Sequence, residues 1–71
     1  MMDWVDIPDS SWVAAIAYDA TVETIYVRFN DNHLHMYLDC PEEIWAEFSS
    51  PETSKGGYIH SVLNQRSHGP A

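Results

Sequence analysis

The first set of side chains with the types and spacing to do chemistry is a group of carboxylates on and around one expected helix. Its members are Asp39, Glu42, Glu43, Glu47 and Glu52. Regularly spaced carboxylates on a rigid helix can take the place of phosphate groups in the basic groove of a nucleic-acid-binding protein. A solvated helix face with a favourable first turn explains the same residues, so both interpretations stay open.

A second set combines aromatic and cationic side chains on an expected β-hairpin. Its members are Tyr26, Arg28, His35 and Tyr37. If all four lie on the outward face of the hairpin, they form a platform on which single-stranded RNA could stack, at about 1 to 3 kcal/mol per base. The alternative is an ordinary solvated sheet face, or a face covered by a second copy of the chain with Trp12 and Tyr26 in the contact.

Metal and nucleophile chemistry have weaker support. His33 and His35 are two residues apart on one strand face and would need a third ligand, such as His60, to hold a metal ion. Nothing in the sequence fixes that ligand, so no metal site and no cofactor is predicted. Cys40 stands at a helix start, where the helix dipole favours a thiolate, but no histidine or asparagine partner can be placed beside it. The sequence therefore predicts that the protein is not an enzyme.

Composition limits the chain to one small domain. It has 71 residues, and its eleven acidic residues outweigh three basic ones to give a formal charge of -8. Such a charge repels nucleic-acid backbones at long range and favours basic partners, although it also keeps a small protein in solution. Three Trp, four Tyr and two Phe supply an aromatic core, which argues against disorder.

Features that report on cellular location are few. The single cysteine, Cys40, excludes an internal disulfide and is compatible with a reducing compartment. The chain starts Met1-Met2-Asp3-Trp4, which has neither the basic nor the apolar region of a signal peptide, and no membrane-spanning segment is predicted. We therefore expect a cytoplasmic protein, or one in the host cytoplasm if a phage encodes it.

The elements that must position these side chains can be placed from periodicity and turn residues. Strands are expected over residues 12–18, 24–29 and 33–38, followed by a helix over 41–49 and a second helix that starts near Ser54. In the third strand, alternation is expected to turn Leu34, Met36 and Leu38 toward the core and His33, His35 and Tyr37 away from it. This order predicts an α+β fold, with a small antiparallel sheet of about three strands followed by two helices packed on one face. Residues 1–9 are expected to form an N-terminal arm, and residues 67–71 a frayed tail.

Short motifs spread along residues 10–66 resemble the KTSC domain, a family of small domains also found at the C-terminus of some lysyl-tRNA synthetases. In chain order, the motifs are Ser10-Ser11, Tyr18-Asp19, His35-Met36-Tyr37, Cys40-Pro41 and Ser54-Lys55-Gly56-Gly57-Tyr58. The resemblance implies the fold of that family, and it suggests RNA binding. Two departures weaken that suggestion. His35 stands where the family has a tyrosine, and the basic residues near the C-terminus are reduced to Arg66.

Charge and resemblance together lead to a prediction of function. We expect a non-enzymatic acidic interaction module that binds a basic or nucleic-acid-binding protein. Lone acidic domains of this size are often phage-encoded, which extends the hypothesis to a phage-type inhibitor or nucleic-acid mimic. The alternative is an RNA-binding or tRNA-binding module that uses the aromatic sheet face. A homodimer is a further prediction.

Overall fold

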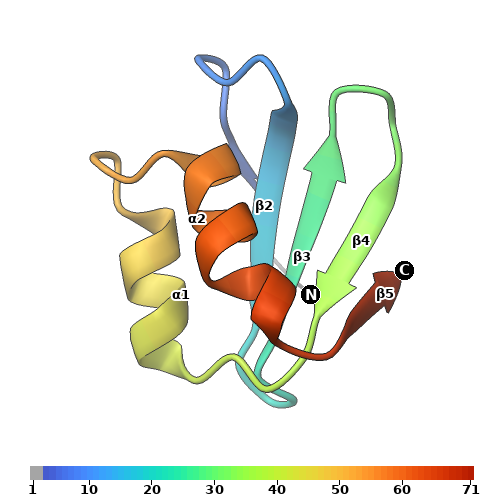
Figure 1. The fold of residues 1–71 in the computed structure, drawn as a ribbon, viewed down its shortest axis with the longest axis vertical. Helices are drawn as coiled ribbons and strands as arrows, with labels where there is room; N and C mark the ends of the chain where they lie inside the picture. Colours follow the sequence, from blue (N-terminus) through green and yellow to red (C-terminus); the bar gives the residue numbers. More distant parts are fainter. Residues whose placement is uncertain (1–2) are drawn as a thin grey trace.

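The computed structural model describes residues 3–71 and places two helices on one face of a five-stranded antiparallel sheet (Figure 1). The elements in chain order are β1 (Val5–Asp6), β2 (Val13–Asp19), β3 (Thr24–Phe29), β4 (Leu34–Tyr37), α1 (Glu42–Ser49), α2 (Lys55–Ser61), the 3₁₀ helix η1 (Leu63–Gln65) and β5 (His68–Pro70). The strands lie in the sheet in the same order as in the chain. Met1 and Met2, the first residues of the expected arm, lie outside the described residues.

The α+β class and the antiparallel sheet are confirmed, whereas the expected number of about three strands is wrong. Both terminal segments add a strand. Val5 of β1 lies opposite Ile16 of β2, and His68 of β5 lies opposite Tyr37 of β4. The residues expected to fray therefore form an edge strand. Segments of two and three residues are too short to show alternation, but pairing satisfies backbone groups that an edge would leave open.

The orientation of β4 is the second correction. Ile25 lies opposite Tyr37, and Val27 lies opposite His35, so both β4 residues share the helix-covered face with Ile25 and Val27. Tyr37 is only 2% exposed, whereas Leu34, on the other face, is 36% exposed. The prediction that Leu34, Met36 and Leu38 face the core was based on apolar character alone. It fails because the hairpin register, together with strand alternation, decides which side chains face inward.

The first helix begins and ends close to the expected residues, and the second begins where it was expected. Pro41 precedes α1 with φ -64°, which is already suitable for a helix start, and Glu42 and Glu43 occupy the first turn. Ser54 caps α2, since its hydroxyl accepts a hydrogen bond from the Gly57 N–H at 3.3 Å. Apolar side chains from both layers close the core. They include Ile16, Ile25, Val27, Tyr37, Phe48, Ile59 and Leu63.

Three non-glycine residues with positive φ lie in turns of the described chain. Asn32 (φ 70°) lies in the β3–β4 connection, as the Asn-Asp-Asn sequence predicts. Glu23 (φ 48°) precedes β3, and Asp39 (φ 56°) lies between β4 and α1. The backbone N–H of Cys40 donates to the Glu23 carbonyl at 2.8 Å, so these two turns meet at one end of the sheet.

Replacement of Tyr37 tests the orientation of β4. We expect Tyr37→Ala to lower the free energy of unfolding by about 3 to 5 kcal/mol, as for other buried aromatic residues, because it leaves a cavity. The matched control is Tyr26→Ala, which removes a half-buried tyrosine from the opposite face of β3. Denaturant unfolding of both variants is the measurement. Equal losses, or a larger loss for Tyr26→Ala, would contradict the described register.

Candidate functional site

All three basic residues contact neutral groups. Arg28 lies over the Trp4 ring, with its Cζ atom 5.6 Å from the ring centroid. Lys55, only 7% exposed, donates from Nζ to the carbonyls of Ser50 (2.7 Å) and Thr53 (3.0 Å). Arg66 donates to the carbonyl of Asp39. Within residues 3–71, no carboxylate pairs with a lysine or arginine, and the one ion pair joins His33 to Asp31 at 3.2 Å.

Four carboxyl-bearing residues gather where the β2–β3 turn meets the start of α1, and we call Glu23, Asp39, Glu42 and Glu43 the acidic end. Tyr18 lies beside this cluster, since its hydroxyl donates a hydrogen bond to the Cys40 carbonyl at 2.7 Å. Burial raises the pKa of Tyr18, and the negative charges of Glu23, Glu42 and Glu43 raise this pKa further. All four residues of the acidic end are exposed.

The acidic residues predicted from the sequence divide into two groups. Asp39, Glu42 and Glu43 lie in the acidic end, as expected. Glu47 is engaged within the molecule, since its Oε1 accepts a hydrogen bond from the Tyr58 hydroxyl at 2.7 Å. Glu52 lies beyond the other end of α1, in the link to α2. The sequence analysis missed Glu23, because only tertiary folding brings the β2–β3 turn beside Cys40.

A shallow groove of about 530 Å³ adjoins the acidic end along α1. It is lined by Glu42, Glu43, Trp45, Ala46 and Ser49. The rings of Trp45 and Tyr18 stack, with their centroids 5.4 Å apart and an interplanar angle of 6°. This stacking restricts the position of the Trp45 side chain. This groove combines carboxylates with the edge of a partly buried aromatic ring.

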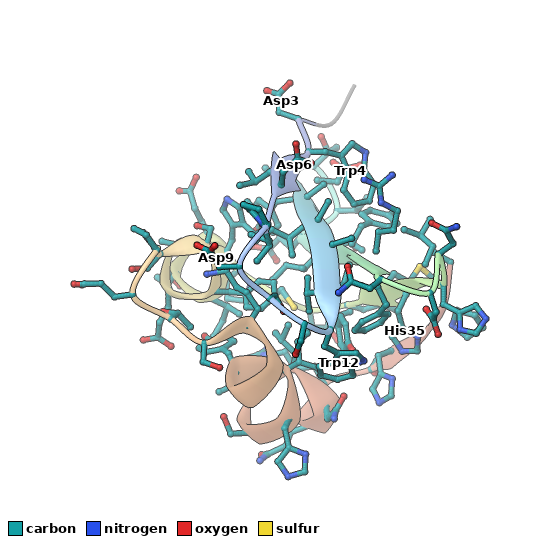
Figure 2. The ribbon with its side chains drawn as sticks, turned by 90° about the horizontal axis from the view of Figure 1, so that it is seen from above. Asp3, Trp4, Asp6, Asp9, Trp12 and His35 are labelled. Carbon is teal, nitrogen blue, oxygen red and sulfur yellow. The ribbon has the colours of Figure 1, made fainter. Side chains whose placement is uncertain are left out.

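The N-terminal arm carries further negative charge. Figure 2 shows Asp3, Asp6 and Asp9 along this segment, with Asp3 directed away from the sheet. Asp6 and Asp9 also line a larger groove of about 710 Å³ between the β1–β2 link and the α1–α2 link. Lys55 lines the same groove, and burial lowers the pKa of its ammonium group.

The aromatic sheet face expected from the sequence does not form. Tyr26 and Arg28 lie on the open face of the sheet, whereas His35 and Tyr37 lie on the helix-covered face. The prediction that they form one platform is wrong, for the reason already given for β4. Figure 2 shows the same division, since Trp4, the partner of Arg28, lies on one side of the sheet and Trp12 and His35 lie on the other.

On the helix-covered side, the structure assembles a different aromatic row from Trp12, Phe29 and His35. The rings of Trp12 and Phe29 stack at 4.8 Å, and those of Phe29 and His35 meet edge-on at 6.5 Å. His35 then contacts His68, with Nε2 and Nδ1 separated by 2.8 Å. Trp12 is 48% exposed. This row was not expected from the sequence, because His35 was placed on the outward face of the hairpin and not on the helix-covered face.

Potential metal ligands and the cysteine complete the survey. Among residues 3–71, no group of three or more His, Cys, Asp or Glu side chains could together hold a metal ion, so His33, His35 and His60 do not combine. Cys40 is fully buried, and burial raises the pKa of its thiol. Its Sγ lies 3.4 Å from the Leu38 carbonyl and 3.5 Å from the Tyr37 carbonyl. In this position the side chain packs within the hydrophobic core.

Comparisons with known proteins agree on the fold. The family model of the KTSC domain matches residues 9–66. The crystal structure of a KTSC domain protein from Yersinia pestis is similar, with a TM-score of 0.87 and 24% sequence identity over 100% of this chain and 99% of that chain. No curated protein matches the sequence. Neither helix of the described residues is long and apolar enough to span a membrane.

The contact between Glu47 and Tyr58 can be tested by titration. Burial raises the pKa of Tyr58 to about 12, with a further contribution from the hydrogen bond and the charge of Glu47. We expect Glu47→Gln to lower this pKa while leaving it above 10.0, because burial is the larger cause. The ring carbon shifts of Tyr58 in NMR spectra follow the titration. Glu52→Gln is the matched control and should leave the Tyr58 pKa unchanged. An unchanged value in Glu47→Gln would contradict the contact.

Proposed function

The chain belongs to the KTSC domain family, and we propose that it is a non-enzymatic interaction module that binds a basic, nucleic-acid-binding protein. The observation that carries this proposal is the use of all three Lys and Arg side chains on neutral groups. Within residues 3–71, the carboxylates are therefore not locally neutralised by ion pairs with these residues, and the formal charge is -8. A net negative charge of this kind attracts positively charged partners and speeds their encounter.

The acidic end is the contact surface in this proposal. Glu42 and Glu43 line the groove beside Trp45, so an arginine of the partner can pair with a carboxylate while its guanidinium group lies against the indole. Tryptophan and arginine are enriched among the residues that dominate binding energy. Because Tyr18 already supports Trp45 by stacking, little side-chain freedom is lost when the partner binds.

The finer proposal is that the carboxylates stand in for nucleic-acid phosphates. A partner that binds DNA or RNA presents lysine and arginine side chains to phosphates, and exposed carboxylates can compete for these side chains. An acidic protein that blocks such a surface would act as an inhibitor, including one of the phage type. The non-enzymatic part of the proposal is supported by Cys40, whose buried thiol with a raised pKa is a poor nucleophile.

Neutralisation of the acidic end tests the proposal. The protein is immobilised, and lysate of its native source is passed over it before and after nuclease treatment. We expect a basic protein to be retained after nuclease treatment and released by salt. The variant Glu42→Gln/Glu43→Gln should bind that protein roughly tenfold more weakly, which corresponds to about 1.4 kcal/mol.

The control carries the same change in charge at the other end of the sheet. Asp9→Asn/Asp31→Asn also removes two of the negative charges but leaves the acidic end intact. It should retain most of the affinity for the captured protein. Equal weakening in both double variants would show that only net charge matters, and undiminished binding by Glu42→Gln/Glu43→Gln would reject the acidic end as the contact surface.

A second candidate function is single-stranded RNA binding, and the row of Trp12, Phe29 and His35 favours it. Trp12 is exposed and its two neighbours in the row are half-buried, so the row offers partly exposed ring surface on which bases could stack. The charge of -8 opposes this function, because each phosphate must approach a negative surface.

The RNA hypothesis makes its own prediction. If it holds, RNA is retained directly on the immobilised protein, and Trp12→Ala weakens binding to single-stranded RNA by about 1 to 3 kcal/mol, the contribution of one stacked base. Tyr26→Ala, on the opposite face of the sheet, is the control and should bind as the unchanged protein does. Affinity that Trp12→Ala leaves unchanged in a filter-binding assay would count against stacking on this row.

A further inference from the structure

Two histidines from neighbouring strands form a pair at the surface, and we call His35 and His68 the histidine pair. In the antiparallel register of β4 and β5, Tyr37 lies opposite His68 and His35 lies opposite Pro70. The two histidines are therefore diagonal neighbours on one face of the sheet. This geometry brings Nε2 of His35 to 2.8 Å from Nδ1 of His68.

Tyr37 packs against both imidazole rings. Its ring centroid lies 5.0 Å from that of His35 and 5.4 Å from that of His68, and Tyr37 itself is buried. The paired nitrogens thus have a packed side chain behind them. The two histidines stand on paired strands and pack against Tyr37, so less conformational entropy is lost when a ligand binds between their nitrogens.

The facing nitrogens are Nε2 on one ring and Nδ1 on the other. In neutral imidazole one nitrogen carries a proton and the other carries a lone pair, and exchange between the two tautomers is easy. In the metal-free protein, one of the two facing nitrogens donates its N–H to the lone pair of the other, which accounts for the 2.8 Å contact. When tautomer exchange moves that proton to the outer nitrogen of its ring, both facing nitrogens carry a lone pair, and a metal ion can take the place of the shared proton.

The distance suits a metal ion after a small adjustment. Zinc-to-imidazole bonds of about 2.0 to 2.1 Å at a tetrahedral angle place the two nitrogens roughly 3.3 to 3.4 Å apart. The nitrogens must therefore separate by about half an ångström from their 2.8 Å contact. His68 is exposed, so rotation of its side chain can supply this movement.

We propose that the histidine pair is a binding site for a divalent transition-metal ion that prefers imidazole ligands, such as Cu²⁺ or Zn²⁺. Two protein nitrogens bind the ion and water completes its coordination, since residues 3–71 provide no cluster of three ligands. The negative field of a chain with formal charge -8 favours the cation. The site is open and exchangeable, unlike the closed four-ligand sites that stabilise small folds.

Titration of the full chain, free of affinity tags, with CuCl₂ and separately with ZnCl₂ tests this proposal. Calorimetry should show saturable binding of one ion per chain, with Cu²⁺ bound more tightly than Zn²⁺. In NMR spectra, the ring signals of His35 and His68 should respond first to either metal.

Substitutions of single histidines provide the decisive comparison. His35→Phe and His68→Phe keep an aromatic ring but remove the ligand nitrogens, and each should weaken Cu²⁺ binding at least about tenfold. The controls His33→Phe and His60→Phe change exposed histidines outside the pair and should bind as the unchanged protein does. Thermal unfolding of all four variants shows that each is folded when its binding is measured.

Several outcomes would overturn the proposal. One is the absence of saturable binding by the unchanged chain. Another is undiminished affinity in both His35→Phe and His68→Phe. A third is metal-induced change in the NMR spectra that is centred on His33 or His60 instead of the histidine pair, a result that remains informative even if a substitution at the pair prevents folding.

Discussion

The burial of Tyr37 beneath the helices is the constraint that decides which side chains lie on each face of the sheet. Tyr37 of β4 lies opposite Ile25 of β3 and belongs to the buried core between the sheet and the helices, and this fixes the side of the sheet to which its neighbours point. Because side chains alternate along a strand, His35 must then share the helix-covered face, while Leu34 and Met36 take the open one. The same constraint separates Tyr26 and Arg28 from His35, and it brings His35 to His68.

The negative charge of the surface has two causes. The chain has only three lysine and arginine residues, and the fold uses them in contacts with neutral groups. Lys55 and Arg66 hold backbone carbonyls at the α1–α2 link and at the turn before α1, and Arg28 supports the N-terminal arm through Trp4. A buried ammonium group such as that of Lys55 loses hydration, so its two carbonyl partners are needed to offset the cost. These structural roles leave the carboxylates of the acidic end facing solvent, and within residues 3–71 none of them forms an ion pair with a lysine or arginine, although Arg66 contacts the Asp39 backbone. The contacts that Lys55, Arg66 and Arg28 make within the fold thus also affect the charge of the surface, because they take up the three cations of the chain.

The terminal strands show a consequence of small size. A sheet of three strands with two helices would leave β2 and β4 as open edges, and a chain of 71 residues has little core to compensate. The β1 and β5 strands cover these edges and also create surfaces. β1 borders the groove near Lys55, and β5 contributes His68. The shared fold with the Yersinia pestis protein at 24% identity shows that this architecture tolerates wide sequence change.

The sequence by itself determined the α+β class, the β3 strand and both helix starts, because these features depend on local signals. Thr24–Phe29 alternates regularly, Pro41 suits a helix start, and Ser54 caps the next helix. The motifs that resemble the KTSC domain are likewise read in chain order. Charge is additive, so the sign of the net charge also follows from the sequence.

Tertiary structure alone decided which face of β4 is buried, that the chain ends form strands, and which distant residues meet. Both faces of β4 carry side chains that can be buried, so the preference of Tyr37 over Leu34 arises only when the register with β3 and the cover of the helices are in place. Glu23 joins Glu42 and Glu43, and His35 joins His68, through contacts between segments far apart in the chain. Local periodicity contains no information on such contacts, because their free energy depends on packing that exists only in the folded molecule.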